Sequence, residues 1–291
     1  MSGTPAFPTA VMGILNVTDD SFSDGGMWST TDRALAHARE MVAAGAHIID
    51  VGGESTRPGA TRVPADVEAS RVVPVIRELH AEGIMTSVDT MRSSTAAAAM
   101  EAGAEIVNDV SGGLADAEMY ATVGDFGADY CLMHWRAQRF ESAEGRADHG
   151  GDVVADVCRV LAELSEKAQD EGIDHDRIIV DPGLGFAKDA DDNWALLSGM
   201  RSYLELGHRV LIGASRKRFL TALRPGDDGA PGTPESADDA TAAVSALAAA
   251  SGAWAVRVHD VAPNRAAVDV AHAVATGHGP ALPGGWRARR G

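Results

Sequence analysis

The chain has 291 residues, of which 45% are hydrophobic and 23% charged, a balance that can bury a large core. This length suits one α/β barrel, typically about 250 residues, better than two separate domains. The formal net charge is −17 and the pI is about 4.9, which argues against a nucleic-acid partner, because such binding needs a basic surface.

Targeting and redox signals are weak in this sequence. No apolar run approaches 18 residues, so we expect no transmembrane helix and no membrane partner. The first residues lack the basic and apolar regions of a signal peptide, which makes a cytoplasmic protein the expectation. The two cysteines, Cys131 and Cys158, are predicted to be buried thiols rather than a disulfide or a metal site.

Strand-like and helix-like segments alternate along the chain. Eight β-branched apolar runs start near residues 10, 47, 85, 106, 129, 177, 209 and 253. Helical spacing or Ala-rich composition marks the segments between them, for example at Val72, Ile76 and Leu79 and at 240–250. Such alternation predicts βα units and a parallel sheet.

Eight units favour closure into a (β/α)8 TIM barrel, a single α/β domain, with an open doubly wound sheet as the alternative. We expect the barrel at 10–276, after an N-terminal extension at 1–9 and before a Gly/Pro-rich tail at 277–291 that is predicted to be disordered. The segment 224–237 is predicted to be a loop within the seventh unit.

Polar side chains follow several of the predicted strands. Asp89, Asn108 and Asp181 each come directly after a Val-rich run, and in a barrel these strand ends converge on one rim. Two carboxylates and a carboxamide are costly to bury without a ligand that donates hydrogen bonds, and a flat heterocycle with an amino-amide edge would satisfy them. A lone Asp after a strand is often a helix N-cap, and Asp50 fits a barrel-bracing role equally well.

Basic groups cluster near the seventh and eighth strands, the usual phosphate side of such barrels. Ser215-Arg-Lys-Arg218 follows strand seven, although a solvated helix start would explain it too. Arg257 and His259 leave strand eight at alternate positions and so share one face. Arg57, on the loop after strand two, is placed to close over the same anion.

Other polar groups at the rim have different predicted roles. Asn16 offers a neutral oxygen to Mg²⁺, which often keeps waters while it bridges phosphates. His134, after strand five, is predicted to be structural, whereas Met133 is placed to pack on a flat ring. The loops at 19–28 and 54–64 are expected to be mobile elements of the catalytic rim.

In combination, these segments resemble the bacterial dihydropteroate synthases, the sulfonamide targets of folate synthesis. The matched motifs run from about Val11 to Val261 and are Gly13-Ile-Leu-Asn-Val-Thr18, Asp20-Ser-Phe-Ser-Asp-Gly-Gly26, Asp50-Val-Gly-Gly-Glu-Ser-Thr-Arg-Pro-Gly59, Ser215-Arg-Lys217 and Arg257-Val-His-Asp260. The resemblance implies a barrel, a homodimer and condensation of 7,8-dihydropterin-6-ylmethyl diphosphate with 4-aminobenzoate, with which sulfonamides compete.

The resemblance also implies roles for individual residues. The implied pterin-binding set is Asp89, Asn108, Met133, Asp181 and Lys217. The implied diphosphate group is Arg57, Arg257 and His259, with Asn16 as the Mg²⁺ ligand. The implied aminobenzoate side, with its loops, is Phe22, Ser23, Asp24, Ser55, Thr56, Phe186 and Arg218.

Three positions depart from the commoner family pattern, namely Asp19, Leu184 and Arg218. Similar changes occur in actinobacterial members, and none removes a matched catalytic group. Two relatives with other activities stay open, a pterin-dependent methyltransferase domain and a pterin-binding paralogue without synthase activity. The methyltransferase would have no use for the basic groups, and a generic phosphate-binding barrel would not need the acidic ones.

Overall fold

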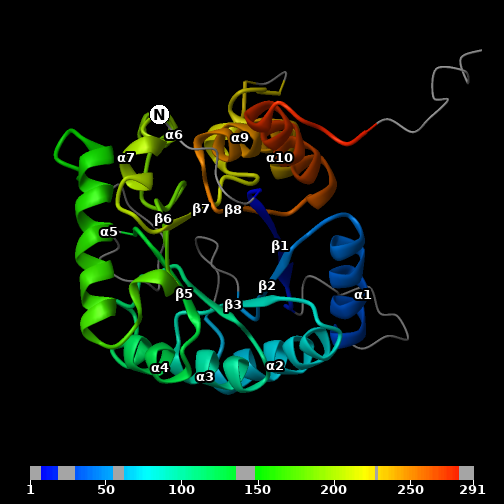
Figure 1. The fold of residues 1–291 in the computed structure, drawn as a ribbon, viewed down its shortest axis with the longest axis vertical. Helices are drawn as coiled ribbons and strands as arrows, with labels where there is room; N and C mark the ends of the chain where they lie inside the picture. Colours follow the sequence, from blue (N-terminus) through cyan, green and yellow to red (C-terminus); the bar gives the residue numbers. More distant parts are fainter. Residues whose placement is uncertain (1–7, 19–29, 55–61, 136–147, 227–228, 282–291) are drawn as a thin grey trace, which may run out of the picture.

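The computed structural model describes residues 8–18, 30–54, 62–135, 148–226 and 229–281, and its strands form a closed parallel barrel (Figure 1). The strands in chain order are β1 (Ala10–Asn16), β2 (Ile48–Gly52), β3 (Thr86–Asp89), β4 (Ile106–Asp109), β5 (Asp129–Met133), β6 (Ile178–Asp181), β7 (Arg209–Ile212) and β8 (Ala255–Val258). Every strand lies where the sequence predicts one.

Closure is visible in the pairing of the first strand. β1 pairs in parallel with β2 on one side and with β8 on the other, so neither edge of the sheet is left open. This pairing confirms the (β/α)8 barrel and excludes the open doubly wound sheet.

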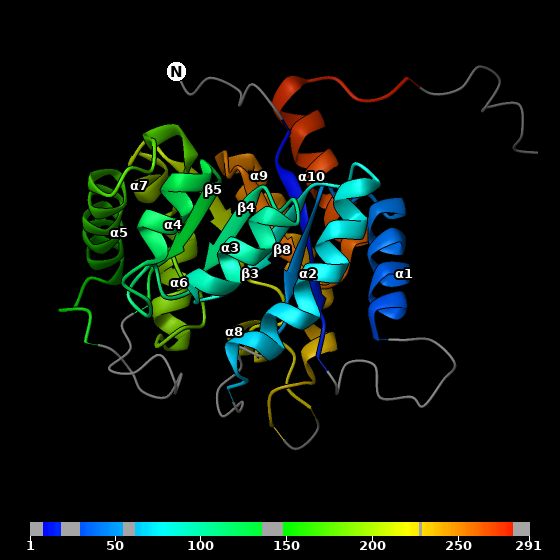
Figure 2. The same ribbon diagram turned by 90° about the horizontal axis from the view of Figure 1, so that it is seen from below.

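Helices surround the barrel, as Figures 1 and 2 show. They are α1 (Thr30–Ala43), α2 (Ala65–Ala81), α3 (Ser93–Glu101), α4 (Met119–Phe126), α5 (Val153–Asp170), α6 (Ala190–Ser198), α7 (Met200–Leu204), α8 (Arg218–Thr221), α9 (Asp238–Ser251) and α10 (Val261–Thr276). Within the predicted loop 224–237, residues Pro234–Ala237 form a 3₁₀ turn that leads into α9. No helix in the described segments is both long and apolar enough to span a membrane.

The hydrophobic core has two layers, one inside the barrel and one between barrel and helices. The inner layer consists of Met12, Ile48, Ile106, Cys131, Ile179, Leu211 and Ala255. The outer layer packs Val, Ile, Leu and Ala side chains of the strands against the helices. Both cysteines are free thiols, and Cys131 is buried as predicted, but Cys158 on α5 is only partly buried.

Strand register places the predicted rim residues beside one another. Asn16 is paired with Gly52, Gly52 with Asp89, and Asp89 with Asn108. On the next strands, Met133 is paired with Asp181. Because the strands are parallel, these pairings bring polar groups that are far apart in sequence to one end of the barrel.

Candidate active site at the carboxyl ends of the strands

A buried hydrogen-bonded network links four strands at this end of the barrel, β2, β3, β4 and β8. Arg257 on β8 donates from Nε to Asp50 Oδ2 at 2.6 Å and from Nη2 to Asp89 Oδ2 at 2.7 Å. Asn108 donates from Nδ2 to the same Asp50 oxygen at 3.0 Å. Asp50 is fully buried, so it braces the barrel, the structural alternative that the sequence had left open.

The two carboxylates in this network also keep capacity for a ligand. Asp50 Oδ1 and Asp89 Oδ1 are buried and have no hydrogen-bond partner among the described residues. Burial raises the pKa of Asp89 to about 7, although neighbouring Arg257 lowers it. A buried acceptor of this kind favours a ligand that donates hydrogen bonds, since an unpaired buried polar group is costly.

Asp181, at the end of β6, provides a third buried carboxylate. Its Oδ1 accepts a hydrogen bond from the backbone N–H of Gly183 at 2.7 Å, which fixes the orientation of the carboxylate. Burial raises the pKa of Asp181, while that hydrogen bond and the nearby charge of Lys217 lower it. A Cβ at Gly213 would lie 3.5 Å from Asp181 Oδ2, so the β7 end approaches this oxygen closely.

Lys217 lies against the loop that follows β6. Its Nζ sits 4.1 Å from the centre of the Phe186 ring, a cation–π contact. Gly185 has a φ of +77°, and a Cβ at that position would meet Lys217 Cδ at 2.7 Å. Burial lowers the pKa of Lys217 to about 8, opposed by the charge of Asp181.

An apolar wall borders these polar groups. Met133 belongs to a buried cluster with Met91, Val110 and Trp135, against which Phe186 packs. The rings of Trp135 and Phe186 are 5.3 Å apart. A flat ring could therefore pack on apolar side chains while its polar edge meets the carboxylates.

His259 and its neighbours form the basic side. Ser215 Oγ lies 2.9 Å from His259 Nδ1 and accepts a hydrogen bond from the His259 backbone N–H at 3.2 Å. Arg216 turns elsewhere, because its guanidinium binds Asp238 through two bonds of 2.8 and 2.9 Å. Arg218 is exposed at the first residue of α8.

Asn16 lies at the end of β1, next to the acidic groups. A Cβ at Gly52 would lie 3.7 Å from Asn16 Oδ1 and 3.6 Å from Asp89 Cβ, so the glycine leaves room between these two side chains. A carboxamide oxygen in such a place is chemically suited to Mg²⁺, which prefers oxygen ligands.

Several predicted residues lie outside the described residues. These are Phe22, Ser23, Asp24, Ser55, Thr56 and Arg57, with most of the two rim loops. Asp19, one of the three departures from the family pattern, lies outside them as well.

Sequence reasoning missed Lys188. This side chain is partly buried, and its Nζ contacts Gly183 O at 2.9 Å, His134 Nδ1 at 3.0 Å, Phe186 O at 3.1 Å and His134 O at 3.3 Å. Lys188 thus fastens the loop after β6, on which Phe186 lies, to the end of β5. Burial lowers the pKa of Lys188 to about 7, and burial also lowers the pKa of His134 to about 3.

A second missed network anchors the chain on either side of residues 55–61. Glu54 is buried and accepts hydrogen bonds from Arg62 Nη1 and Arg92 Nη1, both at 2.8 Å. Arg92 also pairs with buried Glu68 and donates to Val63 O at 2.8 Å. Nothing in the spacing of these residues marks them, because they meet only after β2, α2 and α3 have packed.

Comparison with known proteins identifies the family. Residues 12–259 match the model of the pterin binding enzymes. The dihydropteroate synthase of Mycobacterium leprae (strain TN) is 52% identical over 262 residues, which cover 90% of this chain and 91% of that protein. The Bacillus subtilis (strain 168) enzyme is 44% identical over 254 residues, covering 87% and 84%.

Solved structures agree with the sequence comparison. Xanthomonas albilineans dihydropteroate synthase with 4-aminobenzoic acid superposes with a TM-score of 0.83 at 42% identity, covering 92% of this chain and 93% of that one. The same enzyme with 7,8-dihydropteroate gives 0.80 at 39% identity, covering 92% and 94%. The Yersinia pestis enzyme in a sulfonamide drug complex gives 0.83 at 33% identity, covering 95% and 100%. This chain therefore belongs to the pterin-binding enzyme family, among the dihydropteroate synthases.

Proposed function

We propose that this protein is a dihydropteroate synthase, a transferase that joins 7,8-dihydropterin-6-ylmethyl diphosphate to 4-aminobenzoate and releases pyrophosphate. The observation that carries the proposal is the juxtaposition of a buried acidic pocket with a basic side at one end of the barrel. Asp89 and Asp181 supply the acidic pocket, while Lys217 and His259 supply the basic side. A pterin-dependent methyltransferase would need the acidic pocket but not the basic side.

The pterin is proposed to bind across β3, β4 and β6. The open oxygen of Asp89 and the carboxylate of Asp181 would accept hydrogen bonds from the amino and ring N–H groups. Asn108 would complete the polar edge, and Met133 would pack on the ring face. Each of these groups comes from a rigid strand end, which fixes the position of the ring.

The diphosphate is proposed to lie toward β8. Arg257 and His259 would meet its oxygens, and Arg57 would approach from the second rim loop, while Lys217 would belong to the pterin-binding set. Arg257 is held by Asp50 and Asp89, so it stands between the pterin pocket and the diphosphate side and couples the two. Asn16 would hold the cofactor Mg²⁺, which when bound supplies positive charge to the leaving diphosphate.

The proposed reaction proceeds by dissociative cleavage of the C–O bond, followed by attack of the arylamine on the pterin-methyl cation. Ionised Asp89 and Asp181 would favour the positive charge that develops on the pterin. The basic groups would stabilise the charge that develops on the leaving diphosphate. Phe186, Arg218 and the rim residues Phe22, Ser23, Asp24, Ser55 and Thr56 are proposed to form the aminobenzoate side.

A coupled pyrophosphate-release assay tests the function directly. With the pterin diphosphate, 4-aminobenzoate and Mg²⁺ present, we expect pyrophosphate release that requires the arylamine, and a product with the mass of dihydropteroate. Pterin binding without release would instead indicate an inactive paralogue. Because the Yersinia pestis relative was solved with a sulfonamide, we also propose that sulfonamides compete with 4-aminobenzoate here.

We further propose that the protein is a homodimer in the cytoplasm. Exposed apolar side chains lie on the last two helices, namely Leu247 on α9 and Val270 and Val274 on α10. Exposed apolar surface of this kind favours self-association. Light scattering coupled to size-exclusion chromatography should give twice the monomer mass, and a Leu247→Arg variant that leaves the mass unchanged would place the interface elsewhere.

A further inference from the structure

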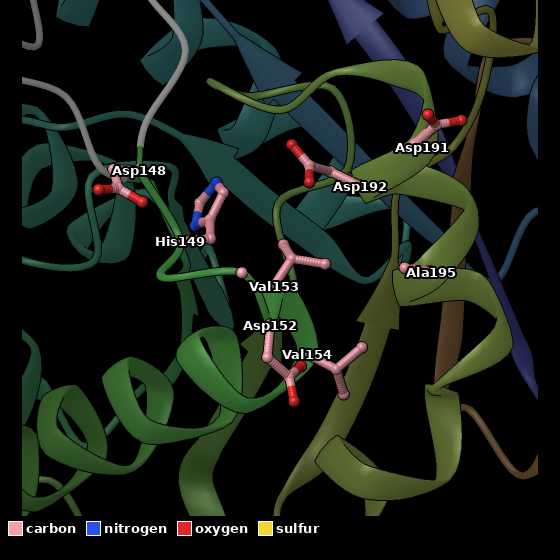
Figure 3. A pocket seen from close by; sticks show the side chains of 9 residues that line it. Asp148, His149, Asp152, Val153, Val154, Asp191, Asp192 and Ala195 are labelled. Atoms are coloured by element: carbon pink, nitrogen blue, oxygen red, sulfur yellow. The ribbon is translucent and has the colours of Figure 1, made fainter.

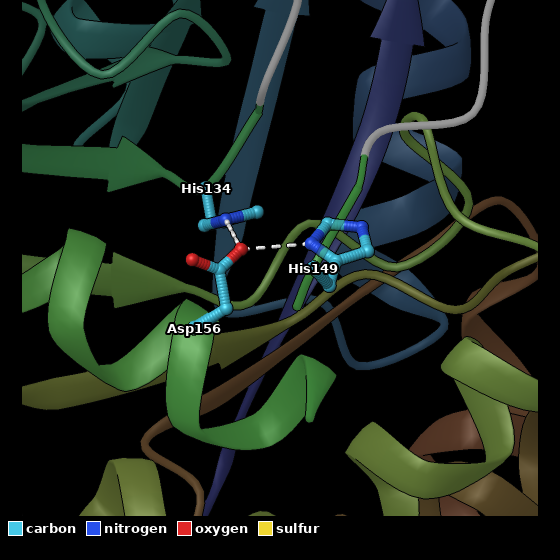
Figure 4. A group of neighbouring side chains, drawn as sticks. All are labelled: His134, His149 and Asp156. Carbon is cyan, nitrogen blue, oxygen red and sulfur yellow. Dashed lines mark hydrogen bonds and ion pairs between the residues drawn. The ribbon is translucent and has the colours of Figure 1, made fainter. Parts of the chain in front are cut away.

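Two histidines and one aspartate gather beyond the end of β5, outside the site described above (Figure 4). His134 directly follows β5, and His149 precedes α5 while Asp156 lies in its first turn. Their ligand atoms all lie within 4.8 Å of one another. His134 and Asp156 are buried and His149 is partly buried, so this is not a cluster of solvated surface groups.

The geometry of the cluster is close to that of a metal site. His149 Nδ1 lies 2.8 Å and His134 Nε2 lies 3.7 Å from Asp156 Oδ2. Two ligand atoms on a tetrahedral zinc ion are about 3.3 Å apart, so each separation is within about half an ångström of that value. His134 is 0% exposed, and Nε2 finds no hydrogen-bond donor or acceptor among the described residues, although it is directed at Asp156.

The outer groups are also arranged as in metal sites. His149 Nε2 lies 3.5 Å from the carbonyl oxygen of Ala187, and a metal-bound histidine commonly donates its second N–H to such a carbonyl. Lys188 Nζ contacts Nδ1 of His134, the ring nitrogen that faces away from the cluster, and Arg159 binds Asp156 Oδ1. These contacts are made by the atoms that face away from the cluster, so Nε2 of His134 and Oδ2 of Asp156 are directed at the shared centre.

A cavity beside the cluster provides room and negative charge. It has a volume of about 550 Å³ and is lined in part by Asp148, His149, Asp152, Asp191 and Asp192 (Figure 3). These carboxylates would attract a cation to the cavity beside the cluster.

We propose that His134, His149 and Asp156 bind a divalent transition-metal ion such as Zn²⁺. Two imidazole ligands suit Zn²⁺ and its neighbours rather than Mg²⁺, so this site is distinct from the one proposed at Asn16. The ion would join the end of β5 to the start of α5, on either side of residues 136–147. Coordination through Nε2 would put the His134 proton on Nδ1, which would donate a hydrogen bond to Nζ of Lys188 as a neutral amine, while that amine donates to the carbonyls of Gly183 and Phe186.

The test is a Zn²⁺ titration of the chelator-treated full-length protein by calorimetry, with Co²⁺ absorption spectra to report the ligand set. We expect one equivalent per chain, a rise in Tm of about 5 °C when Zn²⁺ is in hundred-fold excess over Kd, and loss of both in His149→Ala and Asp156→Asn. His37→Ala is the matched control, because His37 pairs with Glu40 at 3.4 Å on the exposed face of α1 and should keep wild-type binding.

Two results of the titration would overturn the proposal. Absence of saturable binding in the wild type overturns the proposal, and so does an unchanged isotherm in the near-isosteric Asp156→Asn variant. Circular dichroism at the titration temperature checks that each variant is folded. The titration uses no pterin substrate, so its result does not depend on the proposed synthase activity.

Discussion

Arg257 Nη2 donates to Asp89 Oδ2 across 2.7 Å, an ion pair that joins the carboxyl ends of β8 and β3 inside the barrel. The same guanidinium also binds Asp50 on β2, so one cation pairs with two buried carboxylates. Both the geometry of the site and the stability of the barrel therefore depend on Arg257, and a substitution there should change both.

Arg257→Met should destabilise the fold as well as lower turnover. Removing one partner of a buried pair leaves uncompensated charge and costs about 3–5 kcal/mol in free energy of unfolding. Denaturant unfolding measures the loss, with Arg39→Met as control, because the Arg39–Glu82 pair is exposed on the surface. An Arg257→Met protein as stable as the control would mean that the network carries no net stability.

The pH profile of kcat/KM for the pterin substrate should have limbs near 7 and 8. Burial raises the pKa of Asp89 to about 7, so the ionised carboxylate that the proposed mechanism needs is lost as pH falls below that value. Lys217, with a pKa of about 8, loses its charge as pH rises. Asp89→Asn should remove the acid limb, and a limb that persists would belong to another group.

The raised pKa of Asp89 should make the free energy of unfolding fall as the pH rises. An Asp pKa raised above the unfolded value of about 3.9 means that the folded state holds the proton more tightly between pH 4 and 7. Asp89 therefore contributes stability at low pH that is lost as pH rises to about 7. Unfolding of wild type and Asp89→Asn at pH 5 and pH 8 measures this contribution, and the wild type should lose stability relative to Asp89→Asn as the pH rises from 5 to 8.

Gly185→Ala should lower turnover through Lys217. A Cβ there would meet Lys217 Cδ at 2.7 Å, so the lysine must move from the Phe186 ring. Gly207→Ala is the matched control, since Gly207 has a similar φ of +86° but nothing within 4 Å of its Cβ. Both variants should lose about 1 kcal/mol or more to backbone strain, and only Gly185→Ala should lose roughly tenfold or more in kcat/KM. Equal kinetic loss in both would point to strain alone.

Lys188→Met should weaken pterin binding without touching the ligand. The change removes the contacts to Gly183 O, Phe186 O and His134 Nδ1, which leaves buried carbonyls without a donor at about 1–3 kcal/mol each. Displacement of the loop after β6 by about 1 Å could cost 10²-fold in kcat/KM. Steady-state kinetics and pterin calorimetry check this, with Lys167→Met in the last turn of α5 as control. Wild-type pterin affinity in Lys188→Met would exclude the positioning role.

Asn16→Ala tests the proposed Mg²⁺ ligand. If the carboxamide oxygen contacts the ion, the Mg²⁺ concentration for half-maximal activity should rise, while pterin binding measured without Mg²⁺ stays near the wild-type value. A variant with unaltered Mg²⁺ dependence would assign the ion to other oxygens, such as those of the diphosphate.

The sequence by itself determined the eight strands, most helix positions and the convergence of Asp89, Asn108 and Asp181, because apolar periodicity and strand-end polarity are local signals. Tertiary structure alone decided that Asp50 braces Arg257, that Arg216 turns to Asp238 and that Lys188 clamps the β6 loop. It also decided that His134, His149 and Asp156 meet. Except for the contacts of Lys188 within its own loop, these partners are separated by 7 to 207 residues in the sequence. The partner of a long side chain is decided only after packing has fixed the strands and loops around it.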